Sequence, residues 1–116
     1  GYLGHETALY LDLTAAENLR FYAKCYDVSM AEIPALLEKV GLRNRANDMV
    51  RKFSRGMQQR LSIARMLLHR PRLLLLDEPY TGLDQKAAEF LDSILREYHA
   101  QGNCILMISH DIDHTS

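Results

Sequence analysis

The sequence predicts an α/β fold in which parallel strands are preceded by a helical part. Two short apolar runs, residues 73–76 and 104–109, have the length of buried strands. The stretch between these runs shows helical periodicity, so strand, helix and strand form one unit with the usual right-handed crossover. The first seventy residues carry helix-capping patterns instead, which predicts a mostly helical region there.

The first predicted helix is marked by a capping box. Residues 1–5 are interpreted as the end of a strand or as a loop. Thr14 and Glu17 have the spacing at which each side chain satisfies a backbone donor of the other, so a helix is expected from there to about residue 27.

Two more helices follow in this part. Ser29 and Glu32 repeat the capping pattern ahead of a second helix, which Gly41 is expected to end. Residues 43–52 are polar and predict a short helix. Ser54 is expected to cap a third helix that begins near residue 56.

The second part starts where Pro71 ends the third helix. A short strand covers Leu73 to Leu76, and residues 85–100 have apolar side chains at helical spacing up to Gly102. Residues 104–109 are continuously apolar, which predicts a strand buried on both faces of a parallel sheet.

Composition indicates one small domain or a piece of a larger one. The chain has 116 residues, 47% of them hydrophobic, and its longest apolar runs are too short to cross a bilayer. Cys25 and Cys104 lack metal-ligand spacing and are expected to be reduced thiols. No signal peptide is recognisable, which favours a cytosolic chain, and the absence of an initial Met favours a fragment.

Basic residues are concentrated in one segment. Between Lys39 and Arg72 there are ten of the 14 basic residues and a single acid, Asp48. Such a block suits a phosphate, a protein partner or nucleic acid. Phe53 is its only aromatic residue, so nucleic acid is the weaker interpretation because bases need aromatic side chains to stack on.

Two motifs point to nucleotide chemistry. Asp77 and Glu78 close the first strand, where one carboxylate could hold Mg²⁺ while the other orients a nucleophilic water. Alternation along a strand places their side chains on opposite sides, and Pro79 favours an extended backbone at Glu78. The turn Ser54-Arg55-Gly56 opens a helix, which suits either an anion site or an ordinary N-cap.

Histidines supply two further candidates. His110 follows the second strand and should emerge at the same sheet edge as Asp77 and Glu78, near a terminal phosphate. The segment His110–His114 also suggests a transition-metal site, which adjacent ligands at a chain end make the weaker interpretation. Asp84 is expected to cap the next helix.

Together these motifs resemble the ATP-binding subunit of ABC transporters, whose core has the P-loop NTPase fold. The resemblance implies a partial ABC-type core in residues 71–116 and, in residues 1–70, the Q-loop region with the helical subdomain. The matching segments are the signature loop Phe53–Met57, the Walker B strand Leu73–Asp77, the catalytic glutamate Glu78, the D-loop Gly82–Asp84, the switch histidine His110, and His5 at the Q-loop glutamine position.

This resemblance implies roles for the individual residues. Asp77 would hold Mg²⁺, Glu78 would act as general base, and His110 would contact the γ-phosphate. The remaining ATP contacts would come from His5 and, across a head-to-tail dimer, from Ser54, Arg55, Gly56, Met57 and Asp84. The implied partners are a second ATP-binding subunit and a membrane permease, without direct nucleic-acid contact, on the cytoplasmic face of the membrane.

The sequence departs from the family pattern in three places. The phosphate loop, or Walker A motif, is absent from this sequence, so the chain alone is expected to be inactive. Arg55 and Met57 stand where Gly and Gln are commonest in the signature loop, which favours the exporter branches. His5 replaces a glutamine that touches Mg²⁺, and imidazole is a poor Mg²⁺ ligand.

Within the family the segments LGHETALY and LTAAENLRFYAKCYDV look most like the haem-exporter ATP-binding subunit of cytochrome c maturation. FSRGMQQRLSIARMLLH and DEPYTGLDQ support the same assignment. The alternatives are a drug or lipid exporter ATPase, a non-transport ABC ATPase acting on nucleic acid or ribosomes, and an interaction module without hydrolysis.

Overall fold

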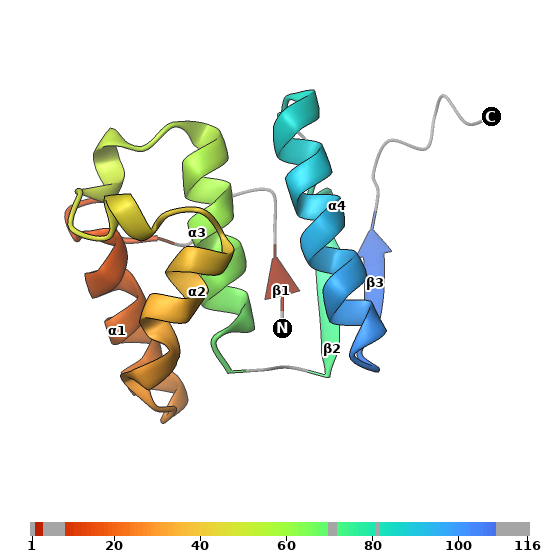
Figure 1. Ribbon diagram of the computed structural model, residues 1–116, viewed down its shortest axis with the longest axis horizontal. Coiled ribbons are helices and arrows are strands. Elements are labelled where there is room, and N and C mark those ends of the chain that lie inside the picture. Colours follow the sequence, from red (N-terminus) through yellow and green to blue (C-terminus); the bar gives the residue numbers. More distant parts are fainter. Residues whose placement is uncertain (1, 4–8, 70–71, 81, 109–116) are drawn as a thin grey trace. The chain divides into compact units, whose positions relative to one another are not determined.

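The computed structural model describes residues 2–3, 9–69, 72–80 and 82–108, with side chains from residue 9 onward. It confirms an α/β fold with parallel strands (Figure 1). Two compact units are present: a helical unit containing α1 to α3, and a sheet unit containing the strands and α4. The elements are β1 (Tyr2–Leu3), α1 (Ala15–Tyr26), α2 (Ile33–Lys39), α3 (Arg55–Leu67), β2 (Leu73–Asp77), α4 (Gln85–Ala100) and β3 (Cys104–Ile108).

Helix α1 begins with the predicted capping box. The Glu17 backbone N–H donates to Thr14 Oγ1 at 3.1 Å, and the Thr14 N–H donates to Glu17 Oε1 at 2.8 Å. The bond from the Thr14 backbone N–H, followed by the Thr14 side chain, lowers the pKa of the Glu17 carboxyl. The helix ends at Asp27, which adopts a left-handed conformation with φ 57°.

A buried asparagine, which the sequence patterns did not single out, fixes the entry into α1. Asn18 is completely buried. Its Oδ1 accepts a hydrogen bond from the Tyr10 N–H at 2.8 Å, and its Nδ2 donates to the Tyr10 and Thr14 carbonyl oxygens at 3.0 Å. The amide therefore replaces water for three backbone groups, which is the usual condition for burying a polar side chain.

The segment between α1 and α3 follows the predicted caps with one correction. Ser29 caps a 3₁₀ turn that leads into α2, and Gly41 follows α2 with φ 75°. In place of one short helix over residues 43–52, the structure has two 3₁₀ turns, Arg43–Arg45 and Val50–Lys52. The three helices contact one another through fully or almost fully buried apolar side chains, among them Leu19, Ala23, Leu37, Leu61 and Ala64.

The described strands of the sheet unit are parallel and ordered β1-β2-β3. Asp77 at the end of β2 is in register with Ile108 at the end of β3, so the carboxyl ends of these strands lie side by side, as predicted. Leu74 and Leu76 of β2 are fully buried. Helix α4 contacts β3 and lies against this part of the sheet in Figure 1.

The prediction that residues 104–109 are buried on both faces is wrong for the described part of β3. Cys104, Leu106 and Met107 are exposed, Leu106 to 54% of its surface, and Leu73 beside them on β2 to 52%. Within the described residues β3 pairs only with β2, which leaves its other edge open. The continuous apolar run therefore predicted the strand correctly, but it did not predict the burial of the side chains.

Candidate functional site

The two acidic residues stand at the junction between β2 and the turn that follows it. Asp77 is the last residue of β2, Glu78 is the next, and both are half-buried. The Glu78 backbone N–H donates to the Ile108 carbonyl oxygen at 2.8 Å, so the start of the turn is tied to the end of β3. Ligands of open parallel sheets bind at this carboxyl edge of the strands.

Glu78 does not have the extended backbone that Pro79 was expected to favour. Its φ is 48°, in the left-handed region that residues with a Cβ rarely occupy. The chain leaves the strand at Glu78, and the bond to Ile108 fixes the Glu78 N–H. The geometry of the turn therefore overrides the preference for an extended backbone before proline. The prediction that the two carboxylates point to opposite sides assumed strand alternation through Glu78, but the strand ends at Asp77. Left-handed residues other than glycine cluster at functional sites.

The turn from Glu78 runs to the N-terminus of α4. The Leu83 N–H donates to the Tyr80 carbonyl oxygen at 3.2 Å, and Gly82 supplies a φ of 79°. Asp84 caps α4 as predicted, because its Oδ1 accepts a hydrogen bond from the Ala87 N–H at 2.8 Å. This cap fixes the far end of the turn.

A side-chain hydrogen bond that the sequence analysis missed holds the middle of the turn. The Tyr80 hydroxyl donates to Asp92 Oδ1 on α4. Burial, followed by this bond, raises the pKa of Tyr80 to about 12, so the phenol keeps its proton at neutral pH. The bond joins residues twelve positions apart across a helix start, a separation for which sequence patterns give no signal.

The predicted anion site lies in the helical unit. Ser54 is the N-cap of α3, and its Oγ accepts a hydrogen bond from the Met57 N–H at 3.2 Å. Ser54 and Arg55 are exposed, Gly56 and Met57 are half-buried, and a Cβ added to Gly56 would meet nothing within 4 Å. The first turn of α3 thus combines capped geometry with open space in front of Gly56, and the positive end of its helix dipole suits an anion.

Two predicted site residues, His5 and His110, lie outside the described residues. So does the segment that suggested a transition-metal site. Among the residues that the structure does describe, no group of three or more His, Cys, Asp or Glu side chains could hold a metal ion. Asp77 with Glu78 nevertheless fits Mg²⁺, which proteins bind through one or two carboxylates while water and phosphate supply the remaining oxygen ligands.

The basic segment packs on aromatic side chains that come from elsewhere in the sequence. The Arg65 guanidinium lies 5.1 Å from the Tyr22 ring centroid, and His69 lies 4.4 Å from Tyr26 between ring centroids. Burial lowers the pKa of His69. Arg65 and His69 therefore pack against α1 inside the helical unit.

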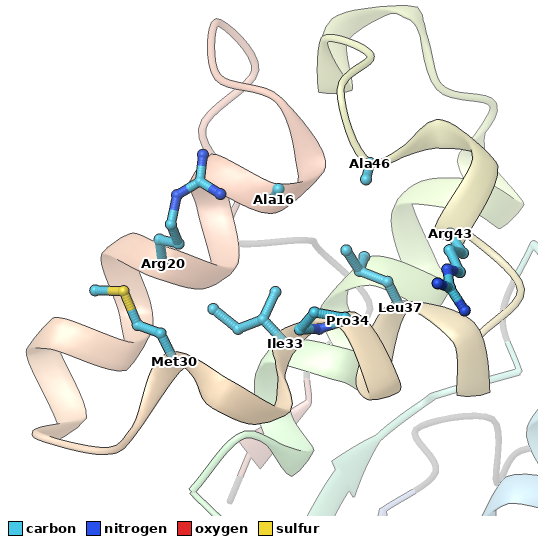
Figure 2. Close-up of a pocket in the computed structure, with 8 residues that line it drawn as sticks. All are labelled: Ala16, Arg20, Met30, Ile33, Pro34, Leu37, Arg43 and Ala46. Atoms are coloured by element: carbon cyan, nitrogen blue, oxygen red, sulfur yellow. The ribbon is translucent and has the colours of Figure 1, made fainter.

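The helical unit also carries a pocket of about 330 Å³ (Figure 2). Ile33 and Leu37 of α2 line it, and Arg20 and Arg43 stand on opposite sides in Figure 2. Arg43 donates a hydrogen bond to Glu38 at 2.8 Å. None of the predicted site residues lines this pocket.

No helix in the described part of the chain is both long and apolar enough to span a membrane.

The chain combines a helical unit with a sheet unit whose parallel strands have acidic residues at their carboxyl edge, and these features occur together in the P-loop NTPase fold. A solved structure titled "Structure of ATP binding subunit of ABC transporter" matches 98% of this chain, with a TM-score of 0.80 and 35% sequence identity. The sequence pattern of the ABC transporter family matches residues 1–81. The chain belongs to the ABC transporter family.

Curated relatives are named as ATP-binding export proteins. The Fluoroquinolones export ATP-binding protein MT2762 of Mycobacterium tuberculosis (strain CDC 1551 / Oshkosh) is 44% identical over 103 residues, which cover 89% of this chain and 34% of the relative. The Cytochrome c biogenesis ATP-binding export protein CcmA of Vibrio cholerae (strain N16961) is 36% identical over 112 residues, which cover 94% and 54%. The chain thus spans about a third to a half of the length of these relatives.

Proposed function

We propose that this chain is part of the ATP-hydrolysing subunit of an ABC exporter. The observation that carries the proposal is the junction at the end of β2, where Asp77 and Glu78 stand at the carboxyl edge of a parallel sheet. The turn that follows leads through Gly82 to the capping residue Asp84. Export is supported by the names of the relatives.

In the intact protein each residue has a separate task. Mg²⁺, when bound, neutralises phosphate charge, and a carboxylate oxygen of Asp77 helps to hold it. Glu78 accepts the proton of the attacking water, and His110 contacts the γ-phosphate. His5 stands at the Q-loop position near the same nucleotide.

A second copy of the subunit completes the site. The exposed Ser54 and Arg55 at the start of α3 support this proposal, together with the open space at Gly56. Ser54, Arg55, Gly56, Met57 and Asp84 would contact ATP held by the other subunit. A membrane permease is the further partner, which places the subunit on the cytoplasmic face of the membrane.

Replacing Glu78 by Gln in the full-length protein tests the catalytic assignment. The amide keeps the shape of the side chain but cannot accept the proton, so we expect ATP hydrolysis to fall by about 10²- to 10⁴-fold while ATP still binds. Steady-state hydrolysis and nucleotide titration measure the two effects. Glu89→Gln, an exposed position on α4, is the matched control and should retain wild-type turnover. Unchanged hydrolysis in Glu78→Gln would refute the assignment.

Residues 1–116 alone should bind Mg-ATP weakly, because their sequence holds no phosphate loop. Tight binding in a calorimetric titration of this chain would contradict that expectation.

Haem export for cytochrome c maturation is the specific cargo that we propose, and the likeness to CcmA supports it. Drug export is the second candidate, favoured by the higher identity to the fluoroquinolone exporters. Deleting the gene separates the two. Loss of c-type cytochromes supports haem export, whereas increased drug sensitivity with normal cytochromes supports the alternative.

A further inference from the structure

We propose that Tyr80 is a positioning residue for Glu78, acting through the hydrogen bond between its hydroxyl group and Asp92. The inference rests on the proposed function, since it concerns the geometry of the proposed general base. Tyr80 itself does not touch the nucleotide in this account. Its effect comes from fixing the turn that carries Glu78.

The turn has two anchors, a backbone hydrogen bond at one end and a side-chain cap at the other. Glu78 is tied to Ile108 of β3 through its N–H, and Asp84 is tied to the first turn of α4 through Ala87. Between these anchors Glu78 occupies a left-handed conformation with φ 48°. Such a conformation persists only when the surrounding structure enforces it. Tyr80, two residues after Glu78, bridges the turn to α4 through its side chain.

The hydroxyl bond attaches the Tyr80 ring to α4. Tyr80 and Asp92 line a pocket of about 460 Å³ with Leu95, Ile105 and Met107. The ring is therefore half-buried beside open space and has room to move when its hydroxyl bond is lost. Asp92 lies on the sixteen-residue helix α4, which gives the bond a rigid base. The raised pKa of Tyr80 keeps the donor proton in place over the neutral pH range.

Tyr80→Phe in the full-length protein removes only the hydroxyl oxygen. We expect kcat for ATP hydrolysis to fall on the order of tenfold, because a small displacement of a general base is costly, while KM for ATP stays within about twofold. Asp92→Ala should likewise lower kcat and leave KM almost unchanged. Asp92→Asn should restore turnover, because its amide oxygen still accepts the hydroxyl proton. The double variant Tyr80→Phe/Asp92→Ala should be no slower than either single variant, since both remove the same bond.

Tyr10→Phe in the helical unit is the matched control and should leave kcat unchanged. The inference is overturned if Tyr80→Phe keeps wild-type kcat, if KM rises as kcat falls, or if the effects of the two single changes multiply in the double variant. It is also overturned if Asp92→Asn is as slow as Asp92→Ala. Failure of the proposed function is recognised separately, because the wild-type protein and Glu78→Gln would then hydrolyse ATP equally slowly.

Discussion

At the residue scale, Glu78 combines a carboxylate with a backbone conformation that suits glycine better. The left-handed region costs a residue with a Cβ roughly 1–2 kcal/mol. Glycine avoids that cost but loses about 0.5–1 kcal/mol more through its greater freedom in the unfolded chain. A glutamate at this point therefore makes the fold less stable than a glycine would.

Glu78→Gly is accordingly expected to raise the free energy of unfolding, by up to about 1.5 kcal/mol, while it removes the proposed general base. Chemical denaturation followed by circular dichroism measures the change. Glu78→Ala is the control, because it removes the carboxylate but keeps the Cβ, and it should show no such gain. A Gly variant less stable than the Ala variant would contradict the interpretation.

At the scale of the element, the N-cap of α3 combines a structural role with a proposed binding role. The Oγ of Ser54 caps the helix through the Met57 N–H, which establishes the structural role. Its exposure at the front of the helix leaves it available to an anion as well. Asp is as good an N-cap as Ser, but its charge repels a phosphate, so one substitution separates the two roles.

Ser54→Ala should lower the free energy of unfolding by about 1 kcal/mol, and Ser54→Asp should restore it. ATP hydrolysis by the full-length protein should be reduced in both variants, because neither presents a neutral hydroxyl group to the γ-phosphate. Thermal or chemical denaturation and a steady-state assay give the two readouts. Wild-type hydrolysis in Ser54→Asp would show that Ser54 is only a helix cap.

Local patterns predicted the elements well because the physics of caps and strands is local. The caps at Thr14, Ser54 and Asp84 each lie within three residues of the groups that they satisfy, so sequence spacing reveals them. The bond from Tyr80 to Asp92 depends on how a turn folds onto a helix, and no spacing reveals it. The candidate acids were predictable as residue types, whereas the left-handed backbone of Glu78 was not.

At the scale of the whole molecule, the chain has two compact units, and both expose some large apolar side chains. The helical unit buries many of its large apolar side chains, including Leu19, Leu42 and Leu61. In the sheet unit β3 exposes Leu106 and Met107 along an edge without a described partner strand. Exposed apolar strand edges promote association between chains.

Leu106→Lys should therefore reduce self-association of residues 1–116, because a lysine on an exposed strand disfavours edge-to-edge pairing. Sedimentation velocity over a range of concentrations measures the effect. Leu11→Lys is the control, since Leu11 is 47% exposed in the helical unit and should leave association unchanged. If both substitutions reduced self-association equally, the added charge and not the strand edge would explain the effect.

The hydrogen bond between the Glu78 N–H and the Ile108 carbonyl also couples the backbone at the end of β3 to that of Glu78. His110 follows Ile108 by only two residues in the chain. A displacement of the backbone at Ile108 would therefore be transmitted to the backbone of Glu78 through one hydrogen bond. The proposed phosphate contact at His110 and the proposed general base Glu78 would then be coupled through this one bond.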